Sequence, residues 1–270
     1  MTLRIKTLQQ RRIGARQRDL GGIGGTGFAQ RFPVGARLRI MTYNIRNGRG
    51  LDERVDLGRI AGVIASFDPD IVALQEVDAH RSRSGTIDQT HALAERLGMN
   101  ATFGPCIDHG NERYGIATLA RLPILTSRQL CLPAQAHRRR SEPRCALVTR
   151  LAWHEAASEL EMVNTHLSVL PGERPAQVAA IAETLDADEV IVAGDFNCTP
   201  RSRAFRTLAC GLRSVVARSA RSWPTRLPLF ALDHILYRGP LTVVHAGTWR
   251  GGAANRASDH LPVVAELERV

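Results

Sequence analysis

Residues 191–197 read Ile-Val-Ala-Gly-Asp-Phe-Asn, and this stretch decides how the rest of the chain is interpreted. An apolar run typical of a buried strand reaches a glycine, and a carboxylate and a carboxamide follow two positions apart. Residues i and i+2 of an extended chain point to the same side, so Asp195 and Asn197 can reach one ligand together. Because Gly-Asp at a strand end is by itself usually a turn, the interpretation depends on how the other strands end.

The composition is ordinary for a soluble globular protein, with 44% hydrophobic and 23% charged residues. A chain of 270 residues can form one large α/β domain or two smaller ones. No apolar run approaches the roughly 20 residues that a membrane span needs, and no signal peptide is evident. We therefore expect a cytoplasmic monomer without an integral membrane segment.

The cysteines are odd in number and have no Cys-x-x-Cys spacing. This pattern argues against a disulfide framework or a zinc knuckle and fits a reducing compartment. The five residues are Cys106, Cys131, Cys145, Cys198 and Cys210.

The first 36 residues differ from the rest. They carry +6 of the formal net charge of +10, which leaves +4 for residues 37–270. Glycines between Gly21 and Gly27 disfavour a helix or a strand, so residues 1–36 are interpreted as a basic, Gly-rich, disordered extension. A mis-assigned start codon and an Arg-rich targeting sequence are alternatives. The basic balance suits a polyanionic partner, although Lys6 is the sole lysine and arginine enrichment can reflect genomic base composition.

From residue 37 onward, strand and helix patterns alternate, which indicates an α/β fold. No internal repeat or break in composition divides residues 37–270, so they are predicted to form one domain. Helices are predicted at 60–67, 93–97 and 174–185, and the region 103–150 is less regular. Strands are predicted at 38–44, 71–74, 114–117, 146–151, 160–165, 190–193, 232–237 and 261–267.

Polar side chains lie at the C-terminal ends of these strands, where ligands bind in an open α/β sheet. Together with residues near the last two strands, they supply four carboxylates and two histidines. Gathering four carboxylates would cost several kcal/mol for each uncompensated charge, and a divalent cation removes that cost. Oxygen-rich ligation favours Mg²⁺ or Mn²⁺ over zinc. The residues are Asn44, Glu76, His166, Asp195, Asn197, Asp233, Asp259 and His260.

Six short motifs around these residues resemble those of the endonuclease/exonuclease/phosphatase superfamily, which includes DNase I-like nucleases, apurinic endonucleases, sphingomyelinases and inositol polyphosphate phosphatases. The motifs occur in the family's order within residues 38–270. The resemblance implies a DNase I-like four-layer sandwich, in which two packed β-sheets are flanked by helices. The motifs are Met-Thr-Tyr-Asn (41–44), Leu-Gln-Glu-Val-Asp (74–78), Asn-Thr-His-Leu (164–167), Gly-Asp-Phe-Asn (194–197), Leu-Asp-His-Ile (232–235) and Ser-Asp-His-Leu-Pro (258–262).

The resemblance implies a metal-binding side of the site. Glu76 resembles the family's principal metal ligand, and Asp259 resembles a further ligand. Asn44 lies beside Glu76 in the family's arrangement and holds the metal or the substrate phosphate. Tyr114 is a weaker match, in a loop expected to contact the substrate.

The resemblance also implies a catalytic side. Asp233 and His260 match an Asp–His pair in which the carboxylate orients the imidazole. Asp195 and Asn197 match the residues that position the attacking water and the phosphoryl oxygens. His166 matches a histidine of the DNase I and phosphatase branches. Either Asp195 or His260 can take the proton of the water.

The implied function is metal-dependent phosphodiester hydrolysis, with a nuclease as the leading interpretation because arginine suits phosphate contacts. The motif at 164–167 disfavours abasic-site repair. Hydrolysis of a phospholipid or another small phosphodiester is the alternative. A catalytically silent binding scaffold is the rival from another class, and the complete set of acidic and histidine residues argues against it.

Overall fold

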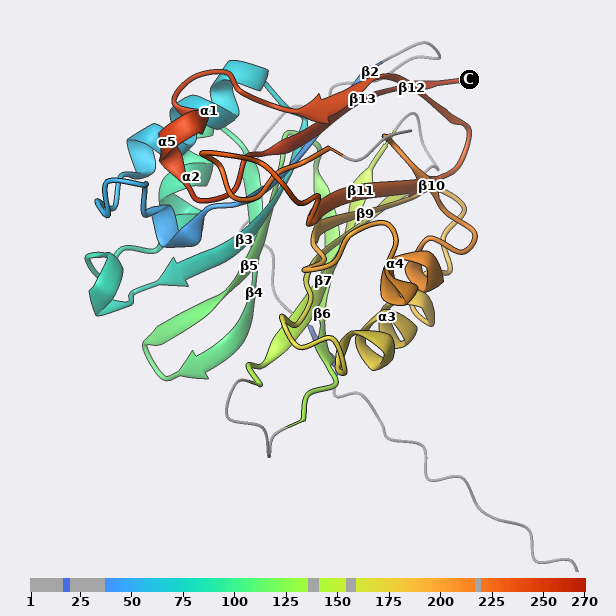
Figure 1. Ribbon diagram of the computed structural model, residues 1–270, viewed down its shortest axis with the longest axis horizontal. Helices are drawn as coiled ribbons and strands as arrows, with labels where there is room; N and C mark the ends of the chain where they lie inside the picture. Colours follow the sequence, from blue (N-terminus) through green and yellow to red (C-terminus); the bar gives the residue numbers. More distant parts are fainter. Residues whose placement is uncertain (1–16, 20–36, 136–140, 154–158, 217–219) are drawn as a thin grey trace, which may run out of the picture.

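The computed structural model describes residues 17–19, 37–135, 141–153, 159–216 and 220–270. Two β-sheets pack face to face, and helices cover their outer faces (Figure 1). The expected α/β fold, a DNase I-like four-layer sandwich, is therefore confirmed. The basic loop at Arg138–Arg140 lies outside the described residues.

The six-stranded sheet has the order β12-β13-β2-β3-β5-β4, and the seven-stranded sheet has the order β1-β6-β7-β8-β9-β11-β10. Only the pairs β2–β3 and β8–β9 are parallel among the described ladders. The first sheet comprises β2 (Arg37–Asn44), β3 (Ile71–Ala79), β4 (Asn100–His109), β5 (Glu112–Ala120), β12 (Leu241–Thr248) and β13 (Val263–Arg269). The second comprises β1 (Gln17–Asp19), β6 (Ile124–Leu132), β7 (Arg144–Ala152), β8 (Glu159–His166), β9 (Val190–Asp195), β10 (Arg213–Ser214) and β11 (Asp233–Arg238).

The helices divide between the two outer faces. The six-stranded sheet is covered by α1 (Leu57–Phe67), α2 (Gln89–Leu97) and α5 (Ala254–Ala257), and the seven-stranded sheet by α3 (Arg174–Ala182) and α4 (Arg203–Leu208). Local sequence explains the bounds of α1. The side chain of Asp56 caps its first turn by accepting from the backbone N–H of Arg59, and Asp68 ends it in a left-handed conformation ahead of Pro69.

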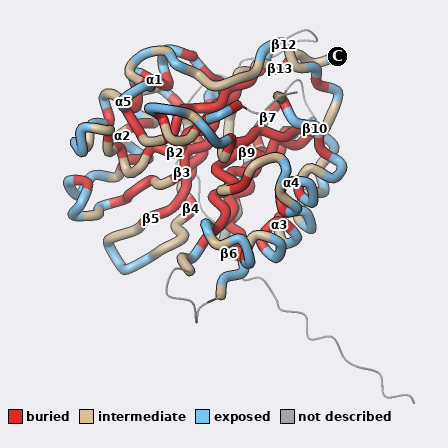
Figure 2. Tube along the Cα trace, in the orientation of Figure 1, coloured by how far each residue is buried: buried red, intermediate tan, exposed pale blue. Residues whose placement is uncertain are grey.

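The central strands are buried on both faces, as the concentration of buried residues in Figure 2 shows. In β9, Ile191 lies between the sheets, whereas Val192 packs beneath the helices of its own sheet. This double burial explains why the strand sequences are continuously apolar. The alternation also continues to the strand end, so Asp195 lies on the same face as Ile191 and points between the sheets.

Several elements differ from the sequence-based prediction. The strands β4, β6 and β12 and the helix α4 were not predicted, and β3 continues past Leu74 to Ala79. Much of β12 is exposed or half-buried, so it lacks the apolar run by which a central strand is recognised. Within the predicted N-terminal extension, Gln17–Asp19 pairs with β6. The division of the chain at residue 36 stays a prediction.

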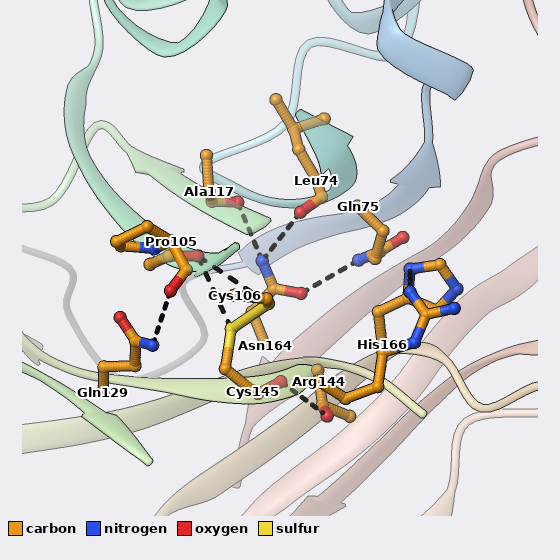
Figure 3. Close-up of a disulfide and its surroundings, with 12 residues drawn as sticks. Leu74, Gln75, Pro105, Cys106, Ala117, Gln129, Arg144, Cys145, Asn164 and His166 are labelled. Atoms are coloured by element: carbon orange, nitrogen blue, oxygen red, sulfur yellow. Dashed lines mark hydrogen bonds between the residues drawn. A yellow bond between two sulfur atoms is a disulfide. The ribbon is translucent and has the colours of Figure 1, made fainter. Parts of the chain in front are cut away.

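A disulfide corrects the interpretation of the cysteines. Cys106 of β4 and Cys145 of β7 are bonded, with their Cα atoms 5.4 Å apart, so the bond links the two sheets (Figure 3). The expectation that argued against disulfides was wrong for this pair. The two cysteines are 39 positions apart in the sequence, and only the packing of one sheet on the other brings them together.

Gly194 is required by close packing. It has φ +154° and lies against the backbone of Thr165 in the parallel neighbour β8, so a Cβ would collide with the carbonyl oxygen of Thr165. We expect Gly194→Ala to lower the free energy of unfolding by about 3 kcal/mol or more, measured by urea denaturation. The control is Gly247→Ala in β12, whose added Cβ meets nothing within 4 Å. Equal stabilities of the two variants would contradict this account.

Candidate active site

The predicted site residues come from both sheets and meet at one edge of the gap between them. The six-stranded sheet and its connections supply Asn44, Glu76, Tyr114, Asp259 and His260, and the seven-stranded sheet supplies His166, Asp195, Asn197 and Asp233. Hydrogen bonds and short distances link the two groups.

A β-bulge places Glu76. The pairing of β3 with β5 shifts between Gln75 and Val77, and Glu76 is the extra residue, with φ +57°. Strand alternation alone would point its side chain toward the helices, because Leu74 and Val77 both pack there. The bulge redirects the side chain. The sequence-based placement of Glu76 at the end of a strand was therefore wrong in its cause, since β3 continues three residues further.

The side chain of Asn44 bridges the two sheets. Its Nδ2 donates to Oε1 of Glu76 at 3.0 Å and to Oδ2 of Asp195 at 3.1 Å, while its Oδ1 accepts from the backbone N–H of Arg46 at 3.1 Å. Its backbone carbonyl accepts from Oγ of Ser258 at 2.7 Å, which secures the segment that carries Asp259 and His260. In this orientation the amide nitrogen, and not the oxygen, faces the acidic groups.

Asp195 lies at the centre of the cluster and is almost fully buried. Its Oδ2 lies 3.5 Å from Nε2 of His166 and 3.8 Å from Nε2 of His260. Its Oδ1 accepts from the backbone N–H of Asn197 at 2.8 Å, and Nδ2 of Asn197 donates to the carbonyl of Leu167 at 2.9 Å. Burial, reinforced by the nearby carboxylate of Asp233, raises the pKa of Asp195 to about 7.

Asp233 and His260 form a close pair, with Nδ1 of His260 2.8 Å from Oδ2 of Asp233. Burial opposes protonation of the imidazole, but the carboxylates of Asp233 and Asp195 outweigh it and raise the pKa of His260 to about 10. Oδ1 of Asp233 is buried and has no hydrogen-bond partner within the described part of the chain.

Arg144 fixes the tautomer of His166. Nη1 of Arg144 lies 3.1 Å from Nδ1 of His166, and the two side chains lie together in Figure 3. A guanidinium can only donate, so Nδ1 must accept and the ring proton must sit on Nε2, which faces Asp195. Burial, and secondarily the charge of Arg144, lowers the pKa of His166 well below its ordinary value. The imidazole is therefore neutral.

Arg144 was missed in the sequence, where nothing distinguishes it among many arginines. Nη2 of Arg144 pairs with Oε2 of Glu142 at 3.1 Å, and its guanidinium also forms a hydrogen bond with the hydroxyl of Tyr114. Tyr114 is buried, and burial together with the carboxylate of Glu76 raises its pKa. The guanidinium of Arg83 lies 5.1 Å from the centre of the Tyr114 ring. Tyr114 therefore belongs to the wall of the site.

A layer of buried polar residues lies beneath the cluster. Nε2 of Gln75 donates to Oδ1 of Asn164 at 2.9 Å, and Nδ2 of Asn164 donates to the carbonyls of Leu74 and Ala117 (Figure 3). These bonds join β8 of one sheet to β3 and β5 of the other. The site therefore rests on a floor whose polar groups are mutually satisfied.

The donor set of this site fits a hard divalent cation. Burial raises the pKa of Glu76, and the charge of Asp259 raises it further, so the two carboxylates lie close enough to repel each other. Single ligand atoms of Asp195, Asp233 and His260 lie within 4.8 Å of one another. An acidic excess of this kind, with oxygen donors and no cysteine, suits Mg²⁺ or Mn²⁺.

None of the helices in the described ranges is long and apolar enough to cross a membrane.

Comparison with known proteins identifies the family. Residues 41–260 match the model of the Endonuclease/Exonuclease/phosphatase family. The uncharacterized protein YbhP of Escherichia coli is 28% identical, over 85% of this chain and 96% of that protein. The human nocturnin catalytic domain with bound sulfate superposes with a TM-score of 0.67 at 24% identity, covering 87% of this chain and 95% of that chain.

A mannosyl-6-phosphatase of Bacteroides thetaiotaomicron superposes with a TM-score of 0.66 at 20% identity, covering 85% of this chain and 99% of that chain. These two structural likenesses show the fold alone. The family match spans most of the chain, from the strand that carries Asn44 to His260. The chain therefore belongs to the endonuclease/exonuclease/phosphatase family, whose members are divalent-metal-dependent phosphoric ester hydrolases.

Proposed function

We propose that this protein hydrolyses phosphodiester bonds of nucleic acids in the presence of Mg²⁺ or Mn²⁺. The observation that carries the proposal is the convergence of Asn44, His166 and His260 on one carboxylate, that of Asp195. Such an arrangement gives an attacking water a proton acceptor and surrounds it with donors for phosphoryl oxygens.

Glu76 and Asp259 would hold the metal, with Asn44 beside them. A bound divalent cation polarises a phosphoryl oxygen and stabilises developing negative charge. We assign it to Glu76 and Asp259 rather than to the Asp233–His260 pair. In that pair the Nδ1 proton of His260 already lies between the two residues at 2.8 Å.

Asp195 is the proposed general base, and Asn197 holds it in place through the backbone N–H bond. His260, oriented by Asp233, presents Nε2 to the same oxygen, where it can donate to the phosphoryl group. His166 presents its Nε2 proton from the other side because Arg144 holds Nδ1. The phosphoryl group would therefore meet donors from both sheets, with Tyr114 in the adjoining wall.

Arginine-rich surroundings support nucleic acid as the substrate, since guanidinium groups pair well with phosphates. A second candidate is a phospholipid. The loop before β11 exposes three large apolar side chains, which suit a lipid surface: Leu227 (65% exposed), Leu229 (52%) and Phe230 (46%). Among proteins of this fold, the Bacteroides relative is named for a sugar phosphate, so fold alone does not choose the substrate.

A substrate panel tests the function. Purified protein is incubated with Mg²⁺ or Mn²⁺ and with plasmid DNA, single-stranded RNA, phospholipid vesicles and bis-p-nitrophenyl phosphate. We expect metal-dependent turnover of the nucleic acids and of the small diester, and none after chelation with EDTA. Turnover of vesicles alone would favour the second candidate. Absence of turnover on every substrate would overturn the proposal.

Metal binding is also expected to stabilise the fold, because a cation relieves the repulsion between Glu76 and Asp259. Mg²⁺ at 100 times its dissociation constant adds about 2.7 kcal/mol, which raises the thermal midpoint by several degrees. Scanning calorimetry with Mg²⁺ and with EDTA measures the shift. Glu76→Gln should lose most of it, whereas Glu95→Gln, at an exposed position on α2, should retain it. An equal shift in both variants would place the cation elsewhere.

A further inference from the structure

An open cleft of about 400 Å³ adjoins the site and has no role in the chemistry described above. It is lined by Thr199, Pro200, Arg201, Arg221, Leu229 and Ala231. One wall begins two residues after Asn197, and another ends two residues before Asp233. Two residues of extended chain span at most roughly 7 Å, so the cleft opens directly beside the reacting groups.

The charges in this cleft are unbalanced. Arg201 and Arg221 are exposed, and no acidic residue lines the cleft with them. Within the described part of the chain, neither guanidinium forms an ion pair or a hydrogen bond. Other arginines near the site are paired, as with Arg83 and Asp78 at 2.7 Å and Arg59 and Asp52 at 2.9 Å. Two free guanidinium groups facing one cleft suit an anion.

The backbone around Arg221 is fixed to the active site. Its carbonyl accepts from Oγ1 of Thr248 at 3.1 Å, and Oγ of the next residue, Ser222, accepts from the backbone N–H of Asp233 at 3.3 Å. Trp223 follows, with its ring centre 6.5 Å from that of His260. The position of Arg221 relative to His260 and Asp233 is therefore set by the fold and not by a free loop.

We propose that this cleft binds the phosphate next to the scissile phosphodiester, which makes a nucleotide strand the substrate. The inference rests on the proposed phosphodiesterase function. A nucleotide strand carries one phosphate per residue, so a second anion always lies one step from the bond being cut. Pro200, Leu229 and Ala231 then offer apolar contact to the intervening sugar. A phospholipid with a single phosphate brings no second anion to the two arginines.

The test compares substrates that differ only in that phosphate. A dinucleoside monophosphate is assayed beside the same compound bearing a 5′ or a 3′ terminal phosphate, and bis-p-nitrophenyl phosphate serves as a diester without neighbours. We expect one phosphorylated form to have a kcat/KM at least about tenfold higher than the unphosphorylated form. The double variant Arg201→Ala/Arg221→Ala should lose this preference while its turnover of the small diester stays unchanged.

The control variant is Arg206→Ala, which removes the same charge from an exposed position on α4 outside the cleft. It should keep the preference. Binding of a fluorescent single-stranded hexanucleotide in EDTA gives a readout without catalysis. Each lost phosphate contact should lower the slope of log K against log salt by about 0.7 in the double variant, and Arg206→Ala should keep the wild-type slope.

The possible failures can be told apart. Small-diester turnover without a preference for the extra phosphate, or a preference that survives in the double variant, would overturn the cleft assignment and leave the chemistry intact. Turnover of phospholipid vesicles in place of nucleotides would do the same. If no substrate is turned over with Mg²⁺ or Mn²⁺, the proposed function fails. The hexanucleotide titration then decides the cleft separately, and equal slopes in the wild type and the double variant would overturn it.

Discussion

Asp195→Asn is expected to reduce kcat on bis-p-nitrophenyl phosphate by about 10²–10⁴-fold, the range for loss of a general base. The substitution keeps the shape of the side chain but replaces an acceptor oxygen with a donor. The amide can no longer take a proton, and it would face the donors Asn44 Nδ2 and His166 Nε2 at the present distances of 3.1 and 3.5 Å. Steady-state kinetics in saturating Mg²⁺ measures the effect.

Two controls separate chemistry from folding. Asp108→Asn removes a carboxylate from an exposed strand position and should leave kcat unchanged. The thermal midpoint of Asp195→Asn in EDTA should not fall, because burial already raises the pKa of this carboxyl to about 7. Its charge costs stability as the pH rises from about 4 toward 7, and a neutral amide removes that cost. A kcat within threefold of the wild type would overturn the role of Asp195.

Glu76→Ala is expected to lower kcat/KM by about 10³-fold through loss of metal-assisted charge stabilisation, a contribution of several kcal/mol. The variant also removes the acceptor of the Asn44 bond at 3.0 Å, so some reorientation of Asn44 is expected. The measurement is the dependence of kcat on Mn²⁺ concentration. Half-saturation should shift to much higher Mn²⁺, with partial recovery at the top of the titration.

The matched control for this experiment is Glu95→Ala, on the exposed side of α2. It should keep both the rate and the half-saturating Mn²⁺ concentration of the wild type. A Glu76→Ala protein that loses activity but keeps the wild-type metal dependence would show that Glu76 acts on the substrate or on Asn44, and that the cation is held by other residues.

The sequence predicts the site best where strand alternation reaches the strand end. Asn44 and Asp195 could be placed on one edge because each continues the face of a buried apolar strand, and packing of the sheets preserves that face. The same reasoning placed His166. These residues required only that the strands be recognised and their period counted.

Residues that depend on register between strands could not be found this way. The bulge at Glu76 is a property of the pairing between β3 and β5, and no local pattern announces it. Arg144 reaches His166 from a neighbouring strand across 22 positions of sequence. The bond between Cys106 and Cys145 depends on packing between sheets. Each is a contact distant in sequence, which one sequence without relatives does not encode visibly.

The bridging amide of Asn44 has a consequence for exchanging segments among relatives. Residues 124–238 build nearly all of one sheet, and the segments before and after them build the other, so each sheet looks like a transplantable module. The proton-handling groups His166 and Asp195 would travel with the first segment, and Glu76 and His260 would stay behind. A chimera could fold well and still be inactive, because catalysis depends on alignment across the boundary between donor and recipient, to within hydrogen-bond distance.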